Sequence, residues 1–145
     1  MSAPGAATSA RPGFVLALAG TAALVAQIVA CGTLDAGLRD TCLAVVPALE
    51  PGDGPLEVVA VEPLPGRADT VRVRYRATPD GDERLVHCAF GIEEDAPHTP
   101  RLIGVRDRSG DLAPARLYLL NRFWLADPAA RAEGRARLRG AAVAR

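Results

Sequence analysis

His87 and Cys88 are adjacent residues that could serve as a base and a nucleophile in this 145-residue chain. Both fall within residues 84–92, RLVHCAFGI, which we expect to form a β-strand. Successive side chains of a strand point to opposite faces of the sheet, so this imidazole and this thiol would not meet. The pattern therefore argues against nucleophilic catalysis by this pair.

An acidic stretch offers the ligand types that divalent cations prefer. Glu93, Glu94, Asp95 and His98 supply carboxylate oxygens and an imidazole nitrogen within six residues. Their spacing matches no closed metal-binding loop, and two nearby prolines are typical of a solvated connection. We therefore expect neither a metal nor another cofactor.

Ser109 is the only serine beyond the N-terminal tail. It lacks the Gly-x-Ser-x-Gly surround that presents a nucleophile, and a turn before a helix explains residues 107–111. The chain thus shows no constellation of acid, base and nucleophile, and we predict that it is not an enzyme. A small hydrolase that uses His87 or His98 is the less favoured alternative.

The surface pattern with the most specificity is an arginine ladder, Arg72, Arg74 and Arg76. In a strand these side chains lie roughly 7 Å apart on one face, where they can bind phosphate groups or an acidic partner. The favoured interpretation is a solvated outer sheet face whose arginines pair with Glu83 and other acids. Whether His87 lies beside the ladder depends on hairpin register, which the sequence leaves open. Zero net charge and few aromatic residues argue against nucleic-acid binding.

Alternation and turn residues predict the elements that hold these side chains. We expect strands at residues 56–61, 70–76, 84–92 and 102–105, and helices at residues 34–46 and 112–125. Short connections between consecutive strands favour an antiparallel meander. The predicted fold class is therefore α+β, with a roughly four-stranded sheet packed against two helices.

The two predicted helices differ in how much of their surface is apolar. In the first, Leu34, Leu38, Cys42 and Val45 share one face, and Pro47 with the following PGDG ends it. The second is expected to begin with Asp111 as its cap and Pro114 in its first turn, and Leu117, Leu120 and Trp124 share a face. Because the second helix is apolar on most sides, it must be covered by more than the sheet.

Residues 128–145 are rich in arginine and alanine and contain Gly134 and Gly140. They predict a weak helix that frays. Residues 115–145 carry seven arginines and two acids, whereas residues 32–69 carry seven acids and two arginines. This asymmetry can steer a charged partner or draw the C-terminal segment to anionic lipid.

The apolar stretch 14–30, FVLALAGTAALVAQIVA, contains no charge and no proline. As a helix it spans about 25 Å, and its flanking small residues bring it close to the hydrocarbon thickness of a bilayer. We predict a transmembrane or signal-anchor helix at residues 13–33, preceded by a short cytoplasmic tail at residues 1–12. Residues 34–127 would then form an exported domain on the periplasmic side of a bacterial inner membrane, attached by a single span.

Three other interpretations of this stretch remain open. Ile28-Val29-Ala30-Cys31 resembles the lipobox of bacterial lipoproteins, which implies lipidation of Cys31. Leu is usual where Ile28 stands, however, and Gln27 is polar where an apolar residue is expected. A cleaved signal peptide is the second alternative, and a buried helix of a soluble protein is the third.

An exported domain is expected to pair its cysteines. With Cys31 set aside at the membrane boundary, Cys42 and Cys88 are the predicted disulfide. Closing a loop of that length stabilises a fold by about 4 kcal/mol in the chain-entropy model. Two buried free thiols are the alternative.

Together these features predict a non-enzymatic, membrane-anchored exported domain that contacts another envelope protein as an accessory subunit. A small module that binds anions through the arginine ladder is the alternative from a different functional class.

Overall fold

The computed structural model describes residues 34–77, 81–93 and 96–140, without the side chains of residues 93–99. All of these residues belong to the compact unit Cys31–Arg145. The predicted anchor at residues 13–33, with its lipidation candidate Cys31, lies outside the described residues. Within the described ranges, no helix is long and apolar enough to cross a bilayer.

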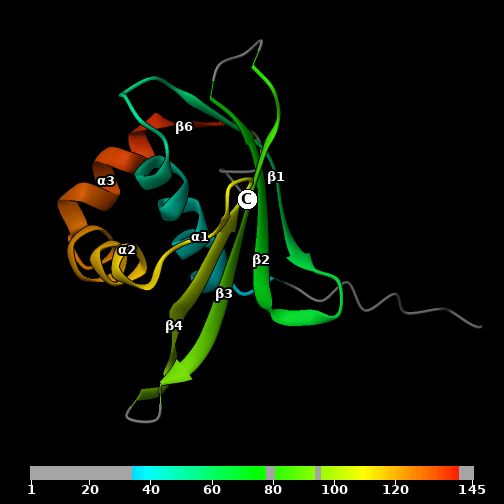
Figure 1. Cartoon of the computed structure of the whole chain (residues 1–145), viewed down its shortest axis with the longest axis vertical. Coiled ribbons are helices and arrows are strands. Elements are labelled where there is room, and N and C mark those ends of the chain that lie inside the picture. Colours follow the sequence, from blue (N-terminus) through cyan, green and yellow to red (C-terminus); the bar gives the residue numbers. More distant parts are fainter. Residues whose placement is uncertain (1–33, 78–80, 94–95, 141–145) are drawn as a thin grey trace, which may run out of the picture. The chain divides into compact units, whose positions relative to one another are not determined.

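The fold is α+β and is built on a mixed six-stranded sheet with the strand order β5-β4-β3-β2-β1-β6 (Figure 1). The expected antiparallel meander is present as its four central strands. The strands are β1 (Leu56–Leu64), β2 (Arg67–Arg76), β3 (Arg84–Glu93), β4 (Ala96–Asp107), β5 (Gly110–Asp111) and β6 (Leu138–Arg139). The sheet is larger than predicted because β5 extends it at one edge, while β6 pairs in parallel with β1 at the other. Two-residue strands are too short to show an alternating pattern.

Alternation along β2 follows the prediction. Val71, Val73 and Tyr75 are buried beneath the helices, and the intervening arginine ladder occupies the outer face. In β4 the alternation is broken, since Leu102 and Val105 are both buried although they are three residues apart. A β-bulge causes this: Ala89 pairs with Gly104 but Phe90 pairs with Leu102, which leaves Ile103 as the extra residue.

Helix α1 (Ala36–Leu49) begins at Asp35, whose carboxylate accepts hydrogen bonds from the backbone N–H groups of Gly37 and Leu38. The expectation that Pro47 ends this helix is wrong, because Pro47 lies inside its last turn and the helix ends at Leu49. Proline there removes a single backbone donor, and the helix has only two more residues to run.

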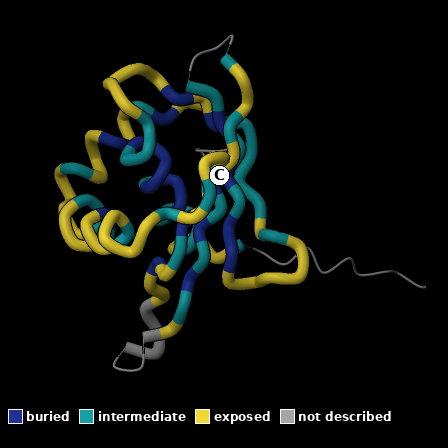
Figure 2. The backbone as a smooth tube through the Cα atoms, viewed as in Figure 1, coloured by how far each residue is buried: buried dark blue, intermediate teal, exposed yellow. Residues whose placement is uncertain are grey.

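Helix α1 forms a layer between the sheet and the remaining helices (Figure 1). More than one of its faces is therefore buried: Cys42, Leu43, Val45 and Val46 are almost fully covered (Figure 2). The outer sides of α2 (Pro114–Leu119) and α3 (Pro128–Arg137) are largely exposed. The single apolar face predicted for α1 understated how deeply this helix is buried.

The second predicted helix consists of α2 followed by a π-helical segment, η1 (Leu120–Leu125). Pro114 lies in its first turn as expected, but Asp111 is not its cap. Ala113 holds the capping position without a side-chain hydrogen bond, and Asp111 lies in β5, where it pairs with Arg106. Leu120 is buried, and Leu117 and Trp124 pack against the core as predicted.

Within the described residues, the C-terminal segment forms α3 and β6. Asp127 accepts a hydrogen bond from the N–H of Ala129 at 2.8 Å and thereby caps α3. Gly134 is buried in the middle of α3, and Leu138 is buried where β6 meets β1. Close packing by a glycine, rather than a broad apolar face, attaches this helix to the fold.

The predicted disulfide is present between Cys42 of α1 and Cys88 of β3. Both residues are fully buried, so the bond joins the helix to the centre of the sheet inside the core.

Candidate functional site

The arginine ladder is matched by an equal number of glutamates. Arg72 Nη2 lies 2.5 Å from Glu62 Oε2, and Arg74 Nη1 lies 3.1 Å from Glu83 Oε1. Arg76 Nη1 completes the set at 3.4 Å from Glu57 Oε2. These pairs are partly exposed, so each contributes little stability, but together they cancel the positive charge of the ladder.

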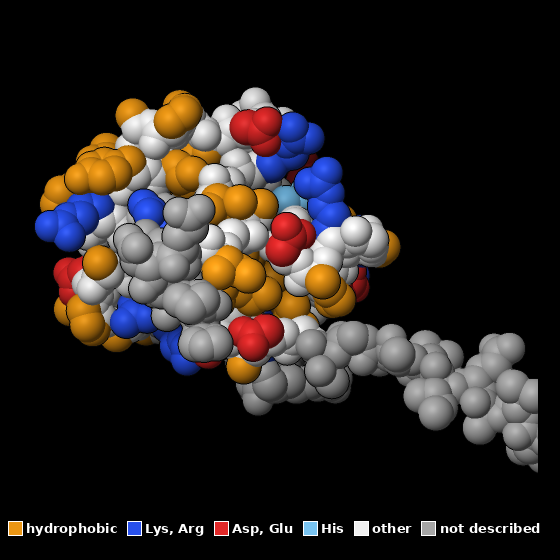
Figure 3. Space-filling model, turned by 90° about the horizontal axis from the view of Figure 1, so that it is seen from below, with side chains coloured by type: hydrophobic (Ala, Val, Ile, Leu, Met, Phe, Trp, Pro, Cys, Tyr) orange, Lys and Arg blue, Asp and Glu red, His pale blue; other side chains and the backbone are white. Residues whose placement is uncertain are grey.

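His87 lies on the same outer face as the ladder, which settles the hairpin register. It is directly opposite Arg72 of β2 and Arg106 of β4, and Figure 3 shows a histidine among arginine and acidic side chains. Partial burial, followed by the two arginines, lowers the pKa of His87 below its ordinary value. Its Nε2 atom is buried without a hydrogen-bond partner. Cys88 points into the core, so the two residues are separated as the sequence predicted.

Of the remaining sequence candidates, Ser109 is engaged in a local turn. The hydroxyl and backbone N–H of Ser109 both donate to Asp107, and the hydroxyl's hydrogen bond lowers the pKa of that carboxyl. In the part of the chain that the structure describes, no three His, Cys, Asp or Glu side chains are placed to hold a metal ion. The side chains of Glu93, Glu94, Asp95 and His98 lie outside that part.

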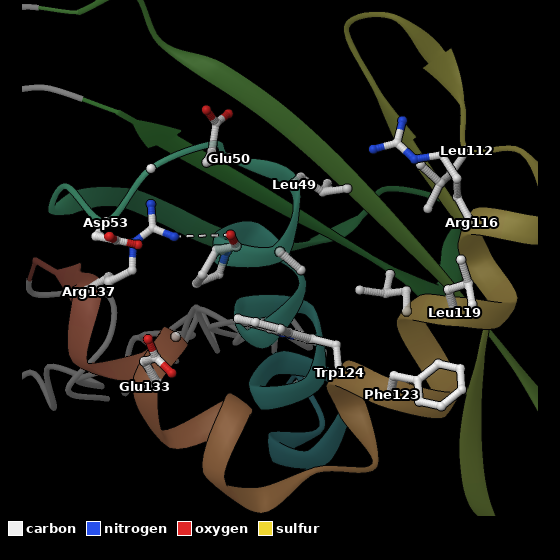
Figure 4. Close-up of a pocket in the computed structure, with 15 residues that line it drawn as sticks. Leu49, Glu50, Asp53, Leu112, Arg116, Leu119, Phe123, Trp124, Glu133 and Arg137 are labelled. Carbon is white, nitrogen blue, oxygen red and sulfur yellow. Dashed lines mark hydrogen bonds between the residues drawn. The ribbon is translucent and has the colours of Figure 1, made fainter.

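A cleft that sequence reasoning missed opens between three helices. This helix cleft has a volume of about 500 Å³ and lies between the C-terminal end of α1, the α2–η1 helix and α3 (Figure 4). Its apolar wall comes from Leu49, Leu112, Leu119, Leu120, Phe123 and Trp124. Trp124 is fixed there because its indole Nε1–H donates to the carbonyl oxygen of Ala44, within α1, at 2.7 Å.

Large apolar side chains at the rim of the helix cleft remain exposed. Leu119 and Phe123 are 52% and 64% exposed, and the neighbouring Tyr118 is 58% exposed. Leu119 and Phe123 both line the cleft, whereas Tyr118 borders a separate hollow beside Leu102 and Ile103. We call Leu119 and Phe123, which are four residues apart on one side of the helix, the apolar ridge. Single apolar residues scattered over a surface are ordinary, but two neighbouring ones that line a preformed cleft are typical of a binding surface. The sequence pattern did indicate it, since residues 112–125 are apolar on most sides.

Charged side chains form the rest of the cleft wall. Asp53, Glu133 and Arg137 lie on one side, and Arg116 lies across from them (Figure 4). Arg137 is held in place, because its Nη1 and Nε donate to the carbonyl oxygens of Pro47 and Gly54, each at 3.1 Å. Within the described residues Asp53, Arg116 and Glu133 make no ion pair, so they can meet charges on a ligand.

Glu50 lines the helix cleft and is held in place by two hydrogen bonds. Its carboxylate accepts hydrogen bonds from the Tyr75 hydroxyl, at 2.6 Å, and from Arg84. Burial, and then the Glu50 carboxylate, raises the pKa of Tyr75. The titratable side chains that line the cleft are carboxylates and arginines.

Comparisons with protein families, with curated proteins and with solved structures find no match to this chain.

Proposed function

We propose that this protein is a non-enzymatic accessory subunit, anchored by residues 13–33 in a bacterial inner membrane with its folded domain in the periplasm. The domain receives an apolar segment of another envelope protein in the helix cleft. The observation that carries this proposal is the apolar ridge, two large exposed side chains that line a cleft of about 500 Å³.

Burial of the ridge is a sufficient source of binding energy. Fully covering one large apolar side chain contributes about 1.5–3 kcal/mol, and such anchors in pockets supply most of the affinity of protein interfaces. The arrangement suits an amphipathic helix whose apolar side chains enter the cleft between α2–η1 and α3.

The charge around the ridge restricts the partner further. Arg116 and Arg122 flank the ridge, are exposed, and make no ion pair within the described residues. The exposed residues of the α2–η1 helix include no acid. We therefore expect acidic residues beside the apolar face of the partner helix.

The two rival functions have less support. Each arginine of the ladder already has a glutamate partner, so an anion would have to displace a carboxylate. A hydrolase with a protein nucleophile would need a free thiol or hydroxyl near His87, but Cys88 is in the disulfide and Ser109 is engaged with Asp107.

The test is site-specific photo-crosslinking in the full-length chain. A benzophenone amino acid at position 119 should give one adduct in intact membranes, mapped to an apolar segment with acidic neighbours. The same probe at Ile92, which is 76% exposed on β3, is the matched control and should give no such adduct. Arg122→Glu should weaken the adduct at least fivefold because it reverses the charge that selects the partner.

Two results would overturn the proposal. One is equal crosslinking from positions 119 and 92. The other is a chain that stays a solitary monomer after extraction in mild detergent, with no adduct at position 119.

A further inference from the structure

A second concavity lies on the outer face of the sheet, and of its lining residues only Leu112 also lines the helix cleft. This outer-face hollow has a volume of about 800 Å³ and is bordered by the β1–β2 hairpin, by β3 and β4, and by the segment that leads into α2. Its size falls within the range of about 300–1,000 Å³ that is usual for small-molecule sites. Arg67, His87 and Arg106 are its basic groups, and Leu64 and Ile103 are among its apolar ones.

The hollow exists because two small residues face each other on neighbouring strands. Ala89 of β3 pairs with Gly104 of β4, and a Cβ added at Gly104 would make only an ordinary 3.7 Å contact with Ala89. The bulge at Ile103 changes the direction of β4 beside this pair. A larger residue at position 104 would therefore fill the hollow without straining the backbone.

The polar groups around the hollow are incompletely satisfied. Arg67 makes no ion pair with any described residue, and His87 Nε2 is one of two buried side-chain atoms in the described part that lack a hydrogen-bond partner. The other such atom is Nε of Arg72, directly opposite His87. Buried polar atoms without partners commonly mark the place of a water or a ligand.

The rim of the hollow already holds a carboxylate. Arg106 grips Asp111 through two hydrogen bonds, from Nε to Oδ1 at 2.7 Å and from Nη2 to Oδ2 at 2.8 Å. This fork geometry suits a planar carboxylate. Arg67, at the β1–β2 end of the hollow, has the same guanidinium group and makes no ion pair with a described residue.

We propose that the outer-face hollow binds a small organic carboxylate, with its charged head at Arg67 and its apolar body over Ala89 and Gly104. This site shares only Leu112 with the lining of the helix cleft, and its basic groups are different ones. It can therefore be tested independently of the proposed partner.

The test uses full-length protein in detergent and 4-fluorobenzoate as the probe, followed by fluorine NMR line broadening. The probe should bind, and the neutral 4-fluorobenzamide should bind at least tenfold more weakly because it lacks the charge. Arg67→Gln should weaken binding of 4-fluorobenzoate at least fivefold. Gly104→Val should abolish it by filling the hollow.

Controls separate this site from the helix cleft and from damage to the fold. Leu119→Ser alters the cleft and should leave 4-fluorobenzoate binding unchanged. Gly104→Ala, which adds a single methyl group, should fold normally and weaken binding in part, so a misfolded valine variant would not leave the test undecided. Circular dichroism and thermal unfolding verify each fold.

Three outcomes would overturn the proposal. Equal line broadening of 4-fluorobenzamide would show that charge does not contribute to binding. Unchanged binding in both Gly104 variants would show that the probe does not bind in the hollow. Displacement of the probe by an equal concentration of inorganic phosphate would show that the apolar body contributes nothing.

Discussion

At the scale of single residues, glutamates determine what the outer face can bind. Glu62 lies within 4 Å of both Arg72 and Arg74, and Glu83 within 4 Å of both Arg74 and Arg76. Each shared carboxylate keeps two guanidinium groups occupied. Among the described residues that border the outer-face hollow, the arginine without an ion pair is therefore Arg67, at the start of β2, and not an arginine of the ladder.

His87 should make stability depend on pH between neutral and mildly acidic conditions. Its pKa is lowered in the folded state, by burial first and then by Arg72 of β2 and Arg106 of β4. The unfolded chain therefore binds the proton first as pH falls below about 6.5. Hence the free energy of unfolding should decrease from about pH 7 downward, until the folded protein is protonated as well.

The variant that isolates this effect is His87→Gln, which cannot titrate. Urea unfolding at several pH values between 7 and 5 should show a shallower loss of stability in this variant than in the unaltered protein. Parallel pH profiles for the two proteins would contradict the assignment, because His98 and the carboxylates are common to both.

At the scale of elements, the position of α3 depends on the absence of a side chain at Gly134. A Cβ at this position would lie 2.8 Å from the Trp124 ring and 3.2 Å from Pro47. The ring cannot readily move aside, because its Nε1–H is bonded to Ala44. Sequence composition suggested that this glycine weakens the helix, whereas the structure shows that it permits the helix to pack.

Gly134→Ala should therefore destabilise the protein. Helix propensity alone would favour alanine by about 1 kcal/mol, but overpacking a tight contact costs about 1–3 kcal/mol. We expect a net loss of about 1 kcal/mol in chemical unfolding. Ala132→Gly, at an exposed position of the same helix, measures the propensity term alone. A stabilised Gly134→Ala variant would show that the close contact does not constrain α3.

The elements that could be predicted are those whose pattern repeats. The alternation in residues 70–76 placed β2 correctly, and the apolar spacing from Leu34 to Val45 located α1. The bulge at Ile103 shifts the burial pattern of β4 by one residue, so only part of that strand was recognisable. Strand β6 has two residues and depends on α3 to bring it to β1, which no local pattern records.

The candidate sites were harder to predict than the fold. The disulfide could be predicted from the number of cysteines and from the expected oxidising compartment. The helix cleft required the relative placement of α1, η1 and α3, and the outer-face hollow required the pairing of Ala89 with Gly104. Both concavities result from contacts between residues distant in sequence. The apolar excess of residues 112–125 was the one local indication of the cleft.

At the scale of the whole domain, the sheet edges favour the helices as the binding surface. At the β4 edge, the side chain of Asn121 in η1 donates a hydrogen bond to the carbonyl oxygen of Leu102. The backbone N–H of Leu112 donates another to the carbonyl oxygen of Val105. At the other edge β6 covers the start of β1. These contacts reduce the length of each edge that is open to a partner strand. The proposed partner would therefore dock on side chains of the α2–η1 helix.

The Cys42–Cys88 disulfide links helix α1 to the sheet. Its sequence separation is 46 residues, and a loop of this size contributes about 4 kcal/mol by restricting the unfolded chain. The Cys42→Ala, Cys88→Ala double variant should lose a comparable amount in denaturant unfolding, because its unfolded state is no longer constrained. Adding reductant should destabilise the unaltered protein but not this variant. A loss below about 1 kcal/mol would mean that packing of Leu43, Val45 and Val46 against the sheet already holds α1 in place.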